Sequence, residues 1–117
     1  MLGTLALVAT IVVGLLHFSF MALETFLWTT PRGLRTFRQT REDAEKSKVL
    51  AANQGVYNGV LGAFLIWSAL LDERTTSLVL LVFVVIVGLY GAATVGRSIL
   101  FIQALPAAIA IALTLMA

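Results

Sequence analysis

The stretch 49-VLAANQGVYNGVLGAFLIWSALL-71 is the clearest indication of a membrane fold, because it is apolar and long enough to cross a lipid bilayer. A helix needs about 20 mainly apolar residues to span the hydrocarbon core. Near its start, however, the segment NQGVYNG at 53–59 places amide and phenol side chains in this apolar context. Such groups are costly against lipid and turn toward other helices. The stretch therefore predicts a membrane helix with one polar face.

The composition of the chain is that of a membrane protein. Of the 117 residues, 60% are hydrophobic and 12% are charged, whereas a soluble domain has about 45–50% apolar and about 25% charged residues. The chain has no cysteine and one histidine, which excludes disulfides and cysteine-ligated metals and argues against a histidine-rich metal site. We expect a single domain over residues 1–117, with no metal and no cofactor.

Three further stretches are long and apolar enough to span a bilayer. The first has no basic region before it, so we expect it to be retained rather than cleaved as a signal peptide. We predict an all-α integral membrane bundle of four transmembrane helices, with a basic loop at 29–48 between the first two. The spans are expected at about 2–28, 49–71, 76–95 and 98–116.

The distribution of basic residues predicts the orientation of the chain. Short cytoplasmic loops of membrane proteins carry an excess of Lys and Arg. Most of the basic residues here lie in the first loop, and Arg97 lies between the last two spans. We therefore expect a multi-pass protein of the bacterial inner (plasma) membrane, with loops one and three in the cytoplasm and both termini outside. The basic residues of the first loop are Arg32, Arg35, Arg38, Arg41, Lys46 and Lys48.

The first loop also carries helix signals. Thr40 with Asp43 three residues later is a helix-capping pattern, and Glu42 with Lys46 is an i,i+4 ion pair. We expect the second helix to begin near Arg41 and to project from the membrane. The preceding RGLRTFR at 32–38 is either a segment at an anionic lipid surface or a solvated loop that only sets topology.

Helical spacing places the polar residues of each predicted span on one face. On the second span, Gly55, Gly59 and Gly62 form a separate face of small residues that lets a neighbouring helix approach closely. Counted from the basic side, the strongly polar groups lie in the cytoplasmic half, and the outer halves of the later spans are mostly aliphatic and alanine. We predict one polar cluster, open or nearly open to the cytoplasm, built from His17, Glu24, Asn53, Gln54, Tyr57, Asn58, Tyr90, Arg97 and Gln103.

Glu24 is the first candidate for chemistry, because an ionisable side chain within a membrane span points to function. With His17, two turns away, it would form an acid–base pair that relays a proton. The structural alternative has Glu24 held by Arg97 or by the amides of Asn53 or Gln54, and His17 bonding between helices.

The other polar residues suit ligand binding or helix adhesion, and the sequence leaves both open. None of the amides is a nucleophile or a base, so their chemical use is hydrogen bonding to a headgroup. We expect Pro106 to kink the last span near Gln103. The proposed ligand-binding residues are Asn53, Gln54, Tyr57, Asn58, Tyr90, Arg97 and Gln103.

Three motifs identify a family resemblance when taken in order: HFSFMALETFLWTTPRG at 17–33, KVLAANQGVYNG at 48–59 and ILFIQALPA at 99–107. The chain resembles the domain of unknown function 1304 family of small bacterial integral membrane proteins over nearly its whole length. The resemblance implies a four-helix membrane protein and brings no reaction. The polar positions that recur in the family match His17, Glu24, Asn53, Gln54, Tyr57, Asn58 and Gln103.

Three classes of function remain open. The preferred class is a membrane protein that binds or transforms a small amphipathic or lipid-like molecule. The alternatives are a proton-coupled small-molecule transporter acting as an oligomer, and a structural or regulatory membrane subunit. The expected partners are membrane lipids, a small amphipathic ligand and a second copy of the chain. We expect no nucleic acid, since topology explains the basic loop. Phosphate-loop, dinucleotide and hydrolase motifs are absent, and whether the protein is an enzyme stays open.

Overall fold

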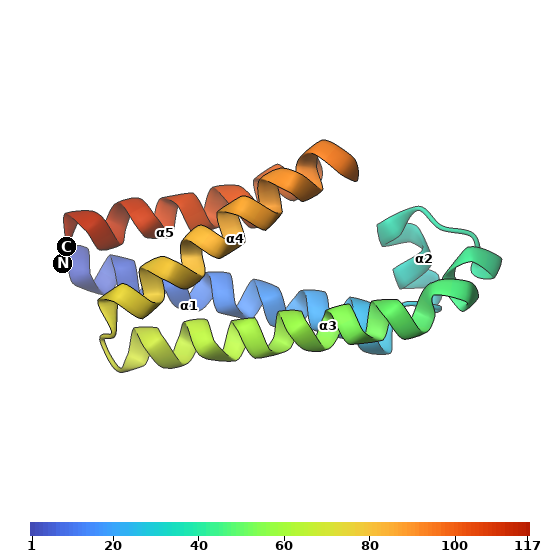
Figure 1. The fold of residues 1–117 in the computed structure, drawn as a ribbon, viewed down its shortest axis with the longest axis horizontal. Coiled ribbons are helices and arrows are strands. Elements are labelled where there is room, and N and C mark those ends of the chain that lie inside the picture. The colour runs from blue at the N-terminus through green and yellow to red at the C-terminus, as the bar shows by residue number, and fades with distance from the viewer. The chain divides into compact units, whose positions relative to one another are not determined.

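The computed structural model describes residues 1–117, except for the side chain of Leu2, and every regular element in it is helical. This confirms the predicted all-α class. Two π-helical turns, Ala22–Phe26 and Leu100–Ala104, adjoin the ends of α-helices. The α-helices, shown in Figure 1, are α1 (Leu2–Met21), α2 (Pro31–Phe37), α3 (Arg41–Leu70), α4 (Arg74–Thr94) and α5 (Leu105–Met116).

Among the residues that the structure describes, three helical stretches are long and apolar enough to cross a membrane: Gly3–Phe26, Arg41–Leu70 and Arg74–Thr94. A shorter apolar helix, Leu100–Met116, falls where the fourth span was predicted. These lengths indicate a multi-pass helical membrane protein, since 1.5 Å of rise per residue makes about 20 residues match the hydrocarbon thickness.

The chain forms two compact units. One consists of Met1–Leu16 and Gly62–Ala117 and is called the terminal unit here; the other consists of His17–Leu61 and is called the central unit. Helices α1 and α3 run through both units. The predicted polar residues are divided between the two units.

The terminal unit packs through apolar side chains and closely approaching backbones. Leu65, Leu81 and Val84 are fully buried in it. A Cβ added at Gly88 would lie 3.0 Å from the Cβ of Ala104, so these positions bring α4 and the start of the last helix close together. Both chain ends lie at the same end of this unit as the turn between α3 and α4 (Figure 1).

The central unit is held by glycines at the contact between α1 and α3. A Cβ on Gly55 would overlap the Thr25 hydroxyl, and one on Gly59 would overlap the Met21 sulfur. Gly33, at the start of α2, likewise packs on the Leu27 carbonyl. The structure thus confirms that Gly55 and Gly59 allow a neighbouring helix to approach closely.

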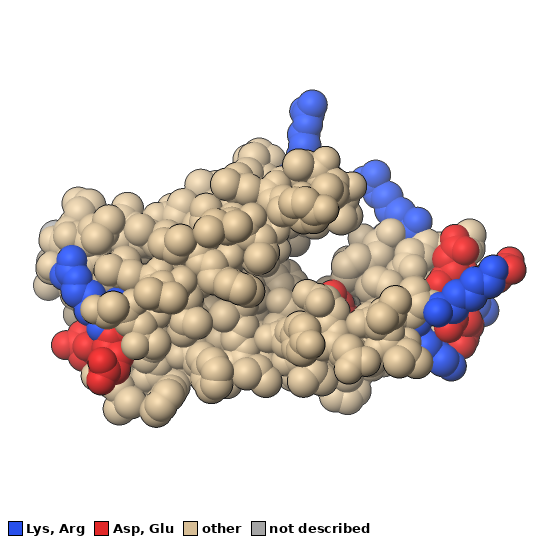
Figure 2. Space-filling model, in the orientation of Figure 1, with Lys and Arg blue, Asp and Glu red and all other residues tan. Residues whose placement is uncertain are grey.

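The predicted loop at 29–48 contains helix α2 and the first turns of α3. As expected, α3 begins at Arg41: the Asp43 amide donates to Thr40 Oγ1 at 3.1 Å, and Lys46 pairs with Glu42 at 3.3 Å. In Figure 2 the charged side chains of this unit gather over α2 and the start of α3. The region is therefore largely helical, with its charges on the surface.

The kink predicted near Gln103 stays a prediction; the structure has a π-helical turn there, Leu100–Ala104, which ends two residues before Pro106. Proline lacks an amide hydrogen, so the helix cannot make its regular bond at that position. The α-helix nevertheless resumes at Leu105 and runs to Met116.

Candidate functional site

Glu24 and Asn58 form the central interaction of the candidate site. The Asn58 side-chain Nδ2 donates to Glu24 Oε1 at 2.5 Å, and both side chains are half-buried. The close approach at Gly55 and Gly59 brings the two helices within reach of this bond. A carboxylate accepting from an amide in an apolar setting gains more from the bond than it would in water. Glu24 is therefore held in a defined position.

Glu24 lies in the π-helical turn Ala22–Phe26, next to Thr25. The Thr25 hydroxyl donates to the Ala52 carbonyl at 3.1 Å. Turns of this kind inside α-helices are frequent at functional sites, because the extra residue re-aims side chains. Here it lets two consecutive side chains, those of Glu24 and Thr25, both contact α3.

A groove of about 420 Å³ in the central unit is lined by residues between Thr25 and Thr29 and by residues of α3 between Lys48 and Val56. Its walls combine the apolar side chains of Val49 and Val56 with the polar side chains of Lys48 and Asn53. The full lining is Thr25, Phe26, Trp28, Thr29, Lys48, Val49, Ala52, Asn53 and Val56. Apolar walls with a few placed polar groups are typical of small-molecule sites.

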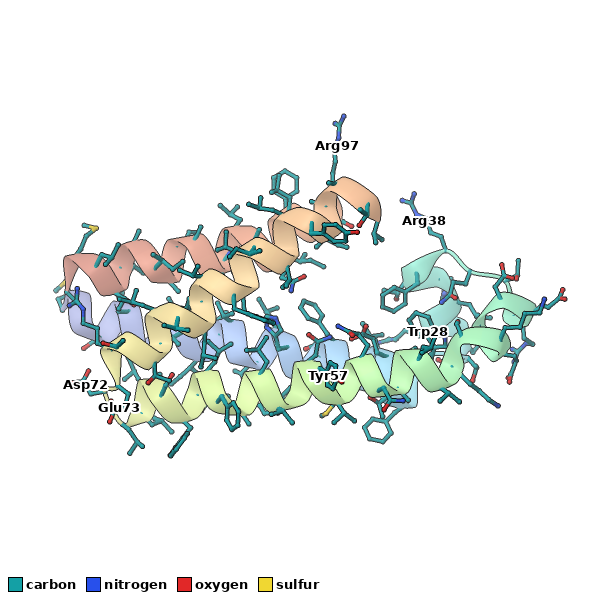
Figure 3. The ribbon with its side chains drawn as sticks, viewed as in Figure 1. Trp28, Arg38, Tyr57, Asp72, Glu73 and Arg97 are labelled. Atoms are coloured by element: carbon teal, nitrogen blue, oxygen red, sulfur yellow. The ribbon has the colours of Figure 1, made fainter. Side chains whose placement is uncertain are left out.

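Trp28, which lines the groove, is held in place by contacts with two helices (Figure 3). Its indole Nε1 donates to Ser47 Oγ at 3.0 Å, and its ring lies 4.7 Å from that of Phe37. Arg41 adds a bond from Nη1 to the Thr29 carbonyl at 3.4 Å. The ring and its neighbours are thus held by contacts from both α2 and α3.

The polar face predicted on α3 is divided in the structure. Asn58 meets Glu24, whereas Asn53 lines the groove and donates to the Val49 carbonyl of its own helix at 2.9 Å. Gln54 and Tyr57 are exposed, Tyr57 to 71%. Asn58, rather than Asn53 or Gln54, is therefore the amide partner of Glu24. Helical spacing placed these residues within one arc but did not say which edge of the arc faces α1.

His17 is fully buried, and its ring meets that of Phe20 edge-on at 5.0 Å. In the terminal unit, Tyr90 is 73% exposed, Gln103 is half-buried, and Arg97 points away from the end of α4 (Figure 3). A site shared between these three residues and Glu24 stays a prediction, as does the proton relay.

Sequence reasoning missed a second polar cluster, in the terminal unit. It consists of four buried hydroxyl residues: Thr10, Ser68, Ser77 and Thr114. The chain does carry a signal for two of them, because Ser68 and Ser77 flank the short turn between α3 and α4 and so come to the same level of an antiparallel pair. The ends of α3, α4 and α5 that carry these residues are therefore less uniformly apolar than the sequence suggested.

Metal binding by acidic or histidine clusters finds no support in the part of the chain that the structure describes. There, no three His, Cys, Asp or Glu side chains are grouped so that they could hold a metal ion. The described side chains of the site offer hydrogen bonding, apolar contact, the carboxylate of Glu24 and the ammonium of Lys48.

Comparison with known proteins identifies the family. The model of the family described as "Protein of unknown function (DUF1304)" matches residues 11–115. The chain belongs to this family. It is also 34% identical over 103 residues to the "Uncharacterized protein YpaA" of Lactococcus lactis subsp. lactis (strain IL1403), covering 85% of this chain and 87% of that protein. No solved structure matches the chain.

These comparisons confirm the resemblance carried by the three sequence motifs. Both descriptions leave the activity open.

Proposed function

We propose that this DUF1304 protein binds a small amphipathic or lipid-like molecule in the groove beside Trp28, as a four-span protein of the bacterial inner membrane. The observation that carries the proposal is the groove itself, about 420 Å³ with an apolar side at Val49 and Val56 and polar groups at Lys48 and Asn53. An amphipathic molecule matches such a lining, because its chain replaces lipid against valine while its headgroup meets the amide and the ammonium.

The proposed orientation places the charged end of the central unit in the cytoplasm and both termini outside. It is supported by the concentration of basic residues in 32–48 and by the positive-inside rule. The position of Trp28 supports placing the groove near the membrane surface, since tryptophan prefers the depth of the lipid headgroups. In this arrangement Lys48 and Trp28 lie near the membrane surface, and Val56 lies about 12 Å deeper at 1.5 Å per residue.

The acid–base role of Glu24 and His17 is kept apart from the groove, because neither side chain lines it. Glu24 contributes to the groove indirectly, through the helix contact that its bond to Asn58 and the neighbouring Thr25 bond hold together. That same pair of bonds favours the second candidate, a structural membrane subunit whose polar contacts only join helices.

Native mass spectrometry of gently extracted protein distinguishes the two functions. Val56→Phe fills the groove from a side chain that is 49% exposed, so the change leaves the buried core intact. Val60→Phe is the matched control, one turn further along α3, 47% exposed and outside the groove. We expect a specific small molecule bound to the unaltered chain and to the Val60 variant, and lost from the Val56 variant. Identical lipids on all three proteins would remove the binding proposal and favour the structural subunit.

A further inference from the structure

Four hydroxyl side chains of the terminal unit line a cavity of about 90 Å³. Each comes from a different helix, and all are buried: Thr10 of α1 is 2% exposed, Ser68 of α3 1%, Ser77 of α4 5% and Thr114 of α5 8%. The remaining lining is Gly3, Ala6, Leu7, Ala69, Asp72, Arg74 and Ala117. Since liquid water occupies about 30 Å³ per molecule, the space suits a solute of two or three non-hydrogen atoms.

The hydrogen bonds of these side chains leave acceptors, not donors, facing the cavity. Thr10 donates to the Ala6 carbonyl at 2.9 Å and Thr114 to the Ala110 carbonyl at 2.7 Å. Ser68 lies 3.0 Å from the Leu65 carbonyl and 2.9 Å from Ser77 Oγ. A hydroxyl has one donor hydrogen and two acceptor lone pairs. Since its hydroxyl hydrogens are used within the protein, the cluster offers lone pairs to a ligand that donates hydrogen bonds.

An apolar layer lies one helical turn from the hydroxyl layer. Each hydroxyl residue has a buried apolar residue three or four positions away on its own helix, and each of these is at most 1% exposed. They are Val13 for Thr10, Leu65 for Ser68, Leu81 for Ser77 and Ala110 for Thr114. Side chains at this spacing lie on the same face of a helix. The cavity is therefore a vestibule with a closed apolar floor.

The charged residues of the lining are one carboxylate and one guanidinium, Asp72 and Arg74. The guanidinium of Arg74 is turned onto the end of α5, with Nη1 3.2 Å from the Ala117 carbonyl and Nη2 3.5 Å from the Leu115 carbonyl. It keeps its positive charge there, and Asp72 and Glu73 of the turn between α3 and α4 (Figure 3) bring two carboxylates to this end of the unit. The choice of a hydrogen-bond-donating ligand therefore rests on the hydroxyl lone pairs.

We propose that this hydroxyl-lined vestibule is a water-filled site for a small ammonium-type cation, of the size of ammonium or methylammonium. Such a cation carries several N–H donors and no acceptor, which complements the lone pairs that the four helices present. The site is independent of the groove in the central unit, and its ligand class differs from the amphipathic molecule proposed there.

The absence of cysteine from the chain gives a direct test, because any thiol introduced is unique. Ser77→Cys and Thr114→Cys place a thiol in the vestibule from two helices, and Leu81→Cys places one in its apolar floor. Exposed Thr75→Cys is the reference. Each variant is placed in lipid nanodiscs, checked by circular dichroism and gel filtration, and treated with the aminoethyl methanethiosulfonate reagent. We expect vestibule thiols to react about tenfold faster than the floor thiol, since thiols in apolar surroundings are inert.

Protection by added solutes tests the ligand class. Ala69 lines the cavity but supplies none of the four hydroxyls, so Ala69→Cys reports protection with the site intact. Methylammonium chloride is expected to slow the labelling of this variant, halving the rate at a concentration equal to its Kd. It should leave Thr75→Cys unaffected. Tetramethylammonium chloride at the same ionic strength is the control, because it has the charge but no N–H donor and more bulk.

The outcomes separate clearly. The proposal would be overturned if the thiols of both the Ser77 and the Thr114 variants react no faster than the floor thiol. That result would show that the cavity is closed to solution. Reactive vestibule thiols without protection by methylammonium, or with equal protection by tetramethylammonium, would overturn the cation site.

Discussion

The side-chain amide of Asn58 donates to the carboxylate of Glu24, and this bond joins α3 to the π-helical end of α1. Asn53 lies on the same helix but donates to the carbonyl of Val49 within that helix. Two amides that look equivalent in the sequence therefore have different energetic roles.

Replacing Asn58 with Leu is expected to destabilise the protein. The change leaves the half-buried Glu24 carboxylate without its donor, which costs about 1–3 kcal/mol. Thermal unfolding in detergent, followed by circular dichroism, measures the effect. Asn53→Leu is the matched control and should lower the melting temperature much less. Equal losses in the two variants would contradict the assigned role of Asn58.

Glu24→Gln tests whether the carboxylate is needed for its charge. The glutamine oxygen still accepts from Asn58, so we expect a loss of only about 1 kcal/mol, the difference between a charged and a neutral hydrogen bond. Because Glu24 does not line the groove, the native mass spectrum should show the same bound molecule. Loss of that molecule would instead assign Glu24 to ligand binding or to acid–base chemistry.

Gly55→Ala is expected to separate α1 from α3. Its added Cβ would overlap the Thr25 hydroxyl and disturb the bond from Thr25 to the Ala52 carbonyl. Overpacking of this kind typically costs about 1–3 kcal/mol. Gly96→Ala is the control, since nothing lies within 4 Å of a Cβ at that position. A Gly55 variant as stable as the Gly96 variant would show that the helix contact tolerates a methyl group.

The proposed topology predicts opposite accessibility of two exposed positions. Thr36→Cys lies in α2 beside the basic residues, and Glu73→Cys lies in the turn between α3 and α4. A membrane-impermeant maleimide should label the Glu73 variant in intact cells and the Thr36 variant only after the membrane is opened. The reverse pattern would invert the orientation and place the groove at the outer surface.

Much of the fold could be predicted from local sequence features. Lengths of apolar sequence located the long helices, and the Thr40–Asp43 cap with the Glu42–Lys46 pair located the start of α3 at Arg41. These features act within a few residues of each other, so no knowledge of the partner helix is needed.

The candidate site was less accessible to prediction. Helical spacing placed Asn53, Gln54, Tyr57 and Asn58 within one arc, yet only one edge of that arc meets Glu24. The π-helical turn Ala22–Phe26 was also unforeseen, and it changes the register of Glu24 and Thr25 against α3. Helical spacing gives the angle between two side chains around the axis of one helix. Packing decides how the helix is rotated about that axis, and so which side chains face a neighbouring helix.

Composition and local patterns were enough to predict a helical chain, apolar enough for a membrane, in which Gly55 and Gly59 bring two helices close. The pairing of Glu24 with Asn58 and of Ser68 with Ser77 is visible only once the helices are packed together. The two kinds of feature differ in the range of the forces behind them. Hydrophobicity and capping act through neighbouring residues, whereas a hydrogen bond between helices depends on how two complete surfaces fit together.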